Sequence, residues 1–363
     1  MRIAIDGAAL NENFTGVGRY LLHLLEELTQ LDSAISYTLF LKNEYAPSFA
    51  HPNVELVFLH SDGGYFAWQN SRLRNAVRRG CFDLFWSPNY TLPLFVGVRS
   101  WLTVHDVSWR ARPGDYPFHI RHFKHLTAAA SIKKAMQIFT DSDFSKEEIQ
   151  ALYPVATGKI TRIHPGVADS FYRESLSRIQ EFVSRHSLAG GPIIGFLGGG
   201  FKRRHISEIL EAFGILKKDF PGMKLLLAGE NYDPGLTKAR ISAPGIVRLE
   251  RIAEPDLNSF YSCLSLLVYV SDYEGFGFPP IEALACGTVP LLQRRSSLAE
   301  IFDGMALFVN RPDPVGIATA IRAFLENEEV LKKEILAEWE RRRPYFSWKR
   351  AAGEYLHEIR NLR

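Results

Sequence analysis

Two carboxylates eight positions apart, Glu274 and Glu282, carry the strongest chemical signal in this sequence. The stretch between them is rich in glycine and proline, which is typical of a tight loop that opens into a helix. A carboxylate in such a loop can accept hydrogen bonds from the hydroxyls of a ligand, and one in the next helical turn can take a vicinal diol such as a ribose. The loop N–H groups and the positive end of the helix dipole attract phosphate. The pattern therefore indicates a sugar phosphate site, although many strand-loop-helix units carry such acids without any ligand.

The elements that must position this pair follow from the apolar runs around it. Residues 264–270 are short, apolar and rich in β-formers, which indicates a buried strand of a parallel sheet. Residues 271–278 form the predicted loop. A helix is expected over residues 279–285, because proline is tolerated in a first turn and Gly287 ends the pattern. A further strand is predicted at residues 288–292.

The string EGFGFPPIEALACGTVP at residues 274–290 resembles the Glu-x7-Glu signature of the retaining family-4 glycosyltransferases of GT-B fold, E-G-F-G-L-P-x-x-E-A-M-A-C-G-T-P-V. Val289 and Pro290 are reversed relative to that signature, past the predicted site. The resemblance implies that Glu282 holds the nucleotide ribose and that Glu274 contacts the donor sugar near its phosphate. It also implies that the intervening backbone binds the sugar and the diphosphate, through Gly275, Phe276, Gly277 and Phe278.

A second glycine loop lies near the N-terminus, between a strand predicted at residues 2–6 and an amphipathic helix predicted at residues 20–31. Alone, Gly16 and Gly18 are as consistent with plain turn chemistry as with a ligand loop. The segment TGVGRY resembles the family's N-terminal loop, which closes over the donor diphosphate and faces the acceptor. On that resemblance we expect Gly16, Gly18 and Arg19 near the ligand.

A polar pair, His105 and Asp106, follows the strand predicted at residues 100–104. The carboxyl ends of parallel strands form the rim where open α/β sheets bind ligands. A lone histidine is more often a structural residue, but TVHDVSW resembles the family's His-Asp segment. The resemblance implies that His105 contacts the donor sugar beside the reacting carbon and that Asp106 is structural.

The second half of the chain begins with an apolar strand and a third glycine loop, GGGFKRRH. Lys202, Arg203 and Arg204 stand at a predicted helix start, where the dipole disfavours cations unless an anion is bound. The family usually has R-K-N here, which implies that Arg203 and Arg204 neutralise the diphosphate and the departing nucleotide. Which of the three cations stabilises the leaving group stays open, because arginine and histidine replace lysine and asparagine. The resemblance also places Arg251 and Ile252 against the nucleobase.

The triplet Asp141, Ser142 and Asp143 has a spacing that can hold a divalent cation against a diphosphate. It ends a predicted strand and precedes a helix that needs an Asp or Ser cap, so capping is the favoured interpretation. The resemblance agrees, because GT-B enzymes of this type need no metal.

Two segments of the first half carry cations with no acidic residue to oppose them. Residues 63–82 have four arginines with Phe66 and Trp68 nearby, and residues 116–140 have four Lys or Arg side chains and three histidines. Basic helices with aromatic neighbours are typical of surfaces that face anionic lipid or a pyrophosphate-linked acceptor. A solvated helix face explains the same pattern equally well.

Composition narrows the class of protein. The net charge of +3 over 363 residues is too small to indicate nucleic-acid binding. Cys81, Cys263 and Cys286 lie in apolar surroundings without metal-ligand spacing, which predicts reduced core residues of a cytosolic protein. The first strand begins at once, without a signal peptide, and no apolar run is long enough to cross a bilayer. We expect a cytoplasmic protein, peripheral on the inner membrane if the basic segments bind lipid.

Strands alternate with helices along the whole chain, which predicts the α/β class with parallel sheets. The length suffices for two cores, and a linker rich in glycine is expected between residues 167 and 191. With the resemblance, the expected fold is GT-B, with two Rossmann-like domains whose parallel sheets face a central cleft. Residues 1–168 and a terminal helix at 346–363 would form the acceptor-binding domain, and residues 169–345 the donor-binding domain.

The resemblance as a whole implies a retaining, metal-independent hexosyltransferase that uses a nucleotide-diphosphate sugar. The opening MRIAIDGAALNENFTGVGRY looks most like bacterial mannosyltransferases of O-antigen or exopolysaccharide synthesis, so GDP-mannose is the expected donor and a glycan or lipid-linked saccharide the acceptor. A UDP-sugar donor and a non-catalytic subunit that binds sugar nucleotides are the alternatives. A Rossmann oxidoreductase is disfavoured, because the first loop lacks G-x-G-x-x-G and no acid closes the second strand.

Overall fold

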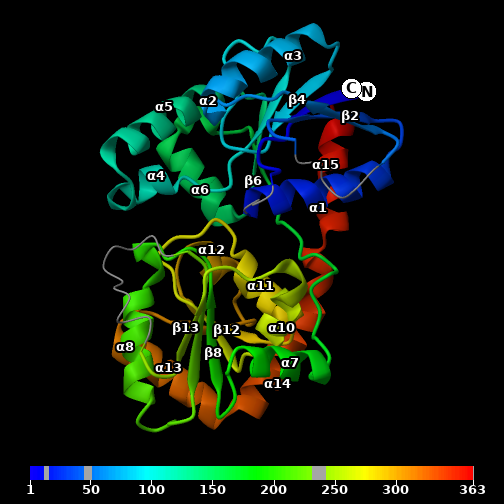
Figure 1. Ribbon diagram of the computed structural model, residues 1–363. Helices are drawn as coiled ribbons and strands as arrows, with labels where there is room; N and C mark the ends of the chain where they lie inside the picture. Colours follow the sequence, from blue (N-terminus) through cyan, green and yellow to red (C-terminus); the bar gives the residue numbers. More distant parts are fainter. Residues whose placement is uncertain (12–15, 45–50, 231–242, 363) are drawn as a thin grey trace. The chain divides into compact units, whose positions relative to one another are not determined.

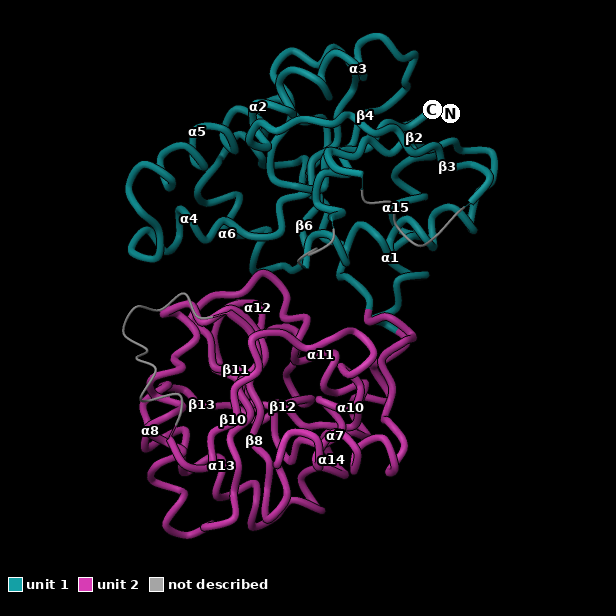
Figure 2. Tube along the Cα trace, in the orientation of Figure 1, with its two compact units in different colours: residues 1–166, 345–363 teal, residues 167–344 magenta. Residues whose placement is uncertain are grey.

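The computed structural model describes residues 1–11, 16–44, 51–230 and 243–362, and the chain divides into two compact units (Figure 1, Figure 2). Unit 1 comprises Met1–Gly166 and Tyr345–Arg363, and unit 2 comprises Val167–Pro344. Each unit has one parallel sheet with helices packed on it. The predicted fold class, α/β with two parallel sheets, is confirmed. The assignment of acceptor and donor to the two domains stays a prediction.

Unit 1 is built on seven parallel strands in the order β3-β2-β1-β4-β5-β6-β7. The strands are β1 (Arg2–Asp6), β2 (Ser36–Leu41), β3 (Val54–Phe58), β4 (Leu84–Ser87), β5 (Ser100–Thr103), β6 (Gln137–Thr140) and β7 (Ile160–Arg162). The central strands are buried along almost their whole length, as expected for a sheet covered on both faces. The chain order reverses between β1 and β4, and ligands of open α/β sheets bind at the carboxyl ends of strands at such a point.

Helices connect these strands, and one more, α15, comes from the C-terminal end of the chain. They are α1 (Gly16–Leu31), α2 (Tyr65–Trp68), the π-helical η1 (Gln69–Leu73), α3 (Arg74–Arg79), α4 (Ser108–Ala111), α5 (Phe118–Lys134), α6 (Asp143–Leu152) and α15 (Trp348–Arg360). α1 begins four residues earlier than predicted, so Gly16 and Gly18 lie in its first turn rather than in a loop. Glycine is tolerated there because first-turn N–H groups have no intrahelical partner in any case. Residues 12–15 of the predicted loop lie outside the described residues.

The last helix, α15, packs against α1 and completes the core of unit 1. Ser347 caps it by accepting a hydrogen bond from the Arg350 N–H. Tyr355 is buried, and its ring centroid lies 4.4 Å from that of Phe139. The resulting aromatic cluster joins the C-terminal segment to the sheet formed by the first half of the chain.

Gly166 lies against the start of α15, where a Cβ atom would come 2.2 Å from the Trp348 backbone nitrogen. Because backbone cannot yield as a flexible side chain does, we expect Gly166→Ala to lower the free energy of unfolding by about 1–3 kcal/mol. Gly353→Ala in α15 is the matched control, since nothing lies within 4 Å of its Cβ position. That variant should be neutral or more stable by up to about 1 kcal/mol. Urea titrations of both variants measure the difference, and equal midpoints would contradict the close contact.

Unit 2 is built on six parallel strands in the order β10-β9-β8-β11-β12-β13. The strands are β8 (Ile193–Leu197), β9 (Lys224–Ala228), β10 (Ile246–Leu249), β11 (Leu266–Tyr269), β12 (Val289–Gln293) and β13 (Leu307–Val309). The longer elements around them are α7 (Leu176–Arg185), α8 (Ile206–Leu216), α10 (Leu257–Ser262), α11 (Phe278–Ala285), α12 (Ser296–Ile301), α13 (Pro314–Glu326) and α14 (Glu328–Arg342). The order reverses between β8 and β11, so these two strands mark the ligand-binding edge expected for unit 2.

Two predictions about side-chain placement are wrong. Trp68 is fully buried and donates its indole N–H to the Leu59 carbonyl, so it is a core residue rather than part of a basic surface. Cys81 is exposed, whereas Cys263 is half-buried and Cys286 is buried; all three are free thiols. Among the described helices, none combines the length and the apolar character needed to cross a bilayer.

Candidate active site

The reversal point of the unit 2 sheet brings together the two motifs that the sequence separates by seventy residues. Arg204 follows β8 and Glu274 follows β11, and they form a two-pronged ion pair. Arg204 Nε donates to Glu274 Oε1 at 2.9 Å, and Nη2 donates to Oε2 at 3.3 Å. Arg204 Nη1 also donates to the Gly199 carbonyl at 3.1 Å, which fixes the guanidinium against the glycine loop. A planar fork of this kind needs arginine, because lysine cannot make both bonds.

The environment holds both groups of this pair in their charged forms. Burial alone would raise the pKa of Glu274, but the positive charges of Arg204 and Arg203 lower it below its usual value. Burial opposes the charge of Arg204 in the same way, and Glu274 more than offsets that effect, so the Arg204 pKa is raised. The ring of Tyr269 lies 5.1 Å from the Arg204 Cζ and adds a cation–π contact.

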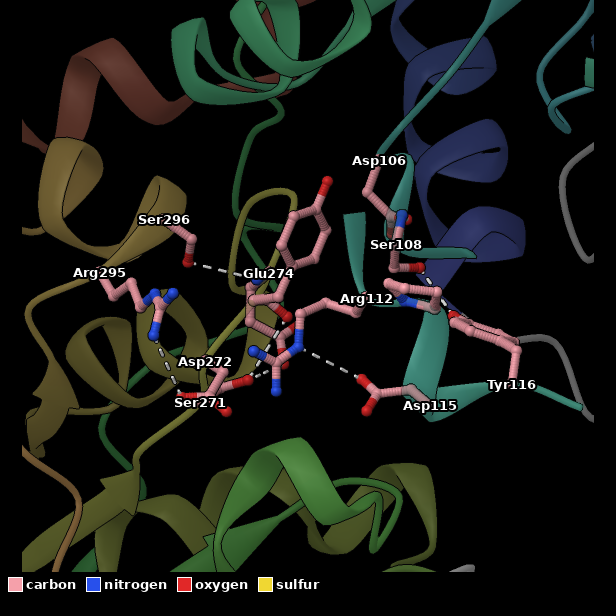
Figure 3. Close-up of polar contacts among 12 residues, drawn as sticks. Asp106, Ser108, Arg112, Asp115, Tyr116, Ser271, Asp272, Glu274, Arg295 and Ser296 are labelled. Atoms are coloured by element: carbon pink, nitrogen blue, oxygen red, sulfur yellow. Dashed lines mark hydrogen bonds and ion pairs between the residues drawn. The ribbon is translucent and has the colours of Figure 1, made fainter. Parts of the chain in front are cut away.

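The first two residues of α12 hold the loop that carries Glu274, and Figure 3 shows the contact of Ser296. Glu274 N–H donates to Ser296 Oγ at 3.3 Å, and Ser297 Oγ donates to the Glu274 carbonyl at 2.8 Å. Ser271 Oγ donates to Glu274 Oε1 at 2.9 Å. These three serines fix both the backbone and the carboxylate of Glu274, and the sequence pattern did not single out any of them.

The glycine loop ends at Gly277, which caps α11 with φ +110°. A Cβ there would lie 2.8 Å from Leu298 Cδ2, so both the backbone conformation and the space require glycine. Pro279 and Pro280 stand in the first turn and have no N–H, so this helix start offers fewer donors than an ordinary one. Any backbone donors to a ligand must therefore come mainly from residues 275–278, the segment that the sequence predicts.

The other cations of the third glycine loop occupy different surroundings. Lys202 is exposed. The Arg203 Cζ stacks 4.5 Å from the Phe201 ring centroid, and its Nε is buried without a hydrogen-bond partner among the described residues. His205 adopts the left-handed conformation at φ 51°, and its Nε2 lies 3.2 Å from Asp272 Oδ1. Asparagine and histidine tolerate this conformation better than most residues, which explains how His205 can stand where the family has asparagine.

Glu282 lies on α11 and is buried, with 3% of its surface exposed. Tyr261 of α10 donates its hydroxyl to Glu282 Oε2 at 2.6 Å. Arg251 and Ile252 follow β10, at the same carboxyl edge of the sheet as the loops after β8 and β11. The predicted ribose, diphosphate and nucleobase residues of unit 2 thus all belong to one edge.

His105 follows β5 in unit 1, and both of its ring nitrogens face oxygen atoms. Nδ1 lies 2.8 Å from Asp141 Oδ2, and Nε2 lies 3.0 Å from the Pro88 carbonyl. Ser145 Oγ donates to the His105 carbonyl at 3.0 Å. A neutral imidazole has a single N–H, so an ion pair between an imidazolium and Asp141 is the state that satisfies both contacts.

Burial lowers the pKa of His105, but the charge of Asp141, its hydrogen bond and the bond to Pro88 outweigh burial and leave that pKa raised. Asp141 Oδ1 is buried and lacks a hydrogen-bond donor among the described residues, so His105 is the main partner of this carboxylate. Ser142, the next residue, caps α6 by accepting from the Ser145 N–H, which confirms capping at this triplet. Asp141 pairs with His105, and Ser142 caps α6. The spacing that resembles a metal site therefore has a structural explanation at both of these residues.

Comparison with known proteins gives the family of the chain. Residues 178–339 match the family described as glycosyl transferases group 1, and residues 14–171 match glycosyltransferase family 4. The chain belongs to the family-4 glycosyltransferases of GT-B fold. It is therefore a retaining hexosyltransferase by family, and the family uses nucleotide-sugar donors and is typically metal-independent.

Relatives and solved structures show how far this similarity extends. An O-antigen chain mannosyltransferase B of Escherichia coli is 25% identical, with 100% of both chains covered. The O-antigen chain mannosyltransferase RfbU of Salmonella typhimurium is 24% identical over 69% of this chain and 67% of its own length. The sucrose-phosphate synthase of Thermosynechococcus elongatus has the same fold at 18% identity, with a TM-score of 0.77 over 99% of this chain and 98% of that one. The structure of Anabaena HepE in complex with UDP-glucose is 16% identical, with a TM-score of 0.74 over 99% of this chain and 100% of that one.

In this glycosyltransferase, an ion pair joins two of the predicted residues of unit 2, Arg204 and Glu274. The contact partners that sequence reasoning missed are Asp141, Ser271, Ser296, Ser297 and Tyr261. Asp141 had a signal, because a polar residue that ends a parallel strand lies at the ligand rim. The three serines and the tyrosine carry no such signal, because their contacts with the site residues form only when the sheet is folded.

The rim of unit 1 beyond His105 is ordered by short local contacts (Figure 3). Asp106 Oδ1 accepts from the Ser108 N–H at 2.8 Å, which is the structural role expected for this residue. Ser108 Oγ lies 2.7 Å from the Tyr116 hydroxyl, and Arg112 pairs with Asp115 at 3.8 Å. These contacts join residues 106–116 to one another just before the start of α5.

Asp141→Asn should remove the part of the pH dependence of stability that comes from the ion pair between His105 and Asp141. Because the folded pKa of His105 is raised, its stabilisation is fully present below the unfolded value of about 6.5 and is lost as pH rises through the folded value. The free energy of unfolding of the unchanged chain should therefore contain a component that falls over that window. In Asp141→Asn this component should vanish, with a loss of about 1.5–3 kcal/mol below the window.

The measurement is a series of urea titrations across pH. Asp143→Asn is the control, because Asp143 lies two residues away, is half-exposed and forms an ion pair with Arg162 at 3.4 Å. It should keep the profile of the unchanged chain. A pH profile shared by both variants and the unchanged chain would refute the ion pair.

Proposed function

We propose that this glycosyltransferase moves mannose from GDP-mannose to a glycan or a lipid-linked saccharide, with retention of configuration. The observation that carries the proposal is the Arg204–Glu274 pair at the reversal point of the unit 2 sheet. The donor assignment is supported by O-antigen mannosyltransferases at 24–25% identity, one of them matched over its whole length. A UDP-linked sugar is the second candidate, because Anabaena HepE binds UDP-glucose on the same fold.

In this proposal Glu282 accepts the ribose hydroxyls, with Tyr261 holding its other oxygen in place. Gly275, Phe276, Gly277 and Phe278 supply backbone donors to the sugar and diphosphate, and Arg251 and Ile252 lie against the base. Glu274 accepts hydrogen bonds from the sugar. His105, Gly16 and Gly18 are assigned to the sugar and diphosphate on the family resemblance alone.

The reaction breaks the bond between the anomeric carbon and the phosphate oxygen and forms a bond to the acceptor oxygen on the same face. The acceptor proton passes to the departing phosphate, so no protein nucleophile is needed. Protein cations then stabilise the charge that develops on the diphosphate, which is the kind of electrostatic effect that dominates many enzymes.

Among the three candidate cations, we assign the direct diphosphate contact first to Arg203. Arg204 is already neutralised by Glu274, whereas Arg203 has a buried Nε without a partner among the described residues. An arginine committed to a carboxylate stabilises a new anion less than one whose donors are unused. Arg204 would act chiefly by fixing Glu274 and by adding its field to that of Arg203. Lys202 is exposed and would contribute least.

A lipid-linked acceptor would place the reaction at the cytoplasmic face of the inner membrane.

The test of the proposed function uses proton NMR of the purified chain with GDP-mannose and, separately, with UDP-glucose. We expect turnover of GDP-mannose, with an α-linked mannosyl product or α-mannose formed first. Turnover of UDP-glucose alone would move the donor to the second candidate, and a β-anomer formed first would contradict retention.

A further inference from the structure

Three segments of unit 1 meet beside α5: α2 with the following η1, the loop at residues 93–96, and α5 itself. The rings of Phe66 on α2 and Phe123 on α5 are 5.1 Å apart. The loop is tied to both sides, because Lys134 Nζ donates to the Pro93 carbonyl at 2.9 Å and the Leu94 N–H donates to Asn70 Oδ1 at 2.7 Å. Segments that are distant in the sequence therefore form one face.

Large apolar side chains stand out of this face into solvent. Phe95 is 79% exposed, Phe118 68%, Leu126 60% and Phe123 50%, and Leu94 and Phe66 are exposed to a smaller degree. We name this set the apolar ridge, and it consists of Phe66, Leu94, Phe95, Phe118, Phe123 and Leu126. Clusters of exposed apolar side chains of this kind mark interaction sites in soluble domains.

The apolar ridge distinguishes between the two interpretations of the basic segments. A solvated helix face carries polar residues outward, as an amphipathic surface helix does. In α5 the inward positions hold small or apolar residues such as Ala128, Ser131 and Ile132, while the outward face presents Phe118, Phe123 and Leu126 as well. Large apolar side chains on the outer face of a helix lose contact with water if that face meets an apolar environment, and their burial there is favourable.

Phe95 adds an independent observation, because it adopts the left-handed conformation at φ 56°. This conformation is costly for a bulky residue and persists only where the surrounding structure enforces it. The hydrogen bonds at Pro93 and Leu94 supply that constraint on one side, and buried Val96 anchors the other. The strained backbone thus presents an aromatic side chain to solvent instead of hiding it.

The charges that α5 carries beside the apolar ridge have a single sign. Lys124 and Lys133 are exposed on α5, the Arg121 guanidinium lies 5.3 Å from the Phe118 ring, and residues 116–140 contain no acid. Aromatic and aliphatic side chains flanked by cations match the interfacial layer of an anionic bilayer, where apolar groups enter the acyl boundary and cations meet phosphates.

We propose that the apolar ridge and its flanking cations form a docking surface for an anionic phospholipid bilayer. Phe95, Phe118 and Leu126 enter the interface, and Lys124 and Lys133 contact the lipid phosphates. The surface lies wholly in unit 1 and is independent of the donor assignment. Its test therefore does not rely on transferase activity.

The test is cosedimentation of the full chain with vesicles of phosphatidylethanolamine and phosphatidylglycerol, and with vesicles of phosphatidylcholine alone. We expect binding to the anionic vesicles that weakens as salt is added, and little binding to the neutral ones. The triple variant Phe95→Ser, Phe118→Ser, Leu126→Ser should bind anionic vesicles at least about tenfold more weakly. Lys124→Gln with Lys133→Gln should weaken binding to anionic vesicles alone.

The matched control is Val315→Ser with Val330→Ser, two valines of unit 2 that are 65% and 61% exposed. It should bind vesicles as the unchanged chain does, and circular dichroism confirms that all variants are folded. The proposal is overturned if the unchanged chain ignores anionic vesicles or if the triple variant binds as well as the control. Self-association that the triple variant abolishes, without vesicle binding, would instead assign the ridge to a second copy of the chain.

Discussion

Arg204→Ala is expected to lower kcat by about 100- to 1,000-fold, because it removes the cation that fixes Glu274 and adds its field to that of Arg203 beside the developing diphosphate charge. The same substitution leaves Glu274 buried without its main counter-charge, since the two form a bidentate pair with 13% and 12% of their side chains exposed. An unpaired buried carboxylate tends to take up a proton, which would also change how Glu274 accepts sugar hydroxyls. The measurement is steady-state release of GDP from GDP-mannose.

Two further variants separate charge from geometry. Arg204→Lys keeps the charge but loses the fork, so about a tenfold loss is expected, between those of the unchanged chain and Arg204→Ala. Arg322→Ala removes an exposed arginine of unit 2 that pairs with Asp219, and it should leave kcat unchanged. If Arg204→Ala retained normal turnover, the ion pair would have no part in catalysis.

Glu282→Gln is expected to weaken nucleoside diphosphate binding about 10- to 100-fold, because hydrogen bonds from ribose hydroxyls to a charged acceptor contribute about 1.5–3 kcal/mol. Glutamine keeps the shape of the buried side chain, so the loss reports charge and not a cavity. Isothermal titration with GDP and with UDP measures the change.

The hydroxyl of Tyr261 provides the companion experiment. Tyr261→Phe removes the 2.6 Å bond to Glu282 Oε2 without touching the predicted ribose oxygen, so its effect should be smaller than that of Glu282→Gln. The reverse ranking would mean that Glu282 serves Tyr261 and the fold and not the ribose. Equal affinity in all three proteins would remove Glu282 from the site.

The sequence predicts the elements of the second half well where glycine and proline mark their ends. The observed α11 runs Phe278–Ala285, and the predicted start was only one residue later. The agreement is close because Gly277 and the two prolines mark the beginning of the helix. The start of α1 had no comparable marker. It was missed by four residues, because Gly16 and Gly18 indicate a loop by propensity while the helix accepts them in its first turn.

The sequence alone does not predict which side chains from distant segments contact each other. The pairing of Arg204 with Glu274 depends on β8 and β11 being neighbours, which is a property of strand order and not of either motif. The roles of Asp141 and Tyr261 depend on tertiary packing in the same way. Trp68 shows the opposite error, since an aromatic residue in a cationic segment was assigned to the surface although it fills the core.

The most direct test of the central claim is thermal unfolding of the purified chain with GDP, UDP, ADP and NAD, repeated on Glu282→Gln. A ligand that binds only the folded state stabilises it, by about 2.7 kcal/mol at a hundredfold excess over Kd. We predict that GDP raises Tm the most in the unchanged chain and that Glu282→Gln loses this increase. Stabilisation by NAD with no response to any nucleoside diphosphate would contradict a nucleotide-sugar site at Glu274 and Glu282.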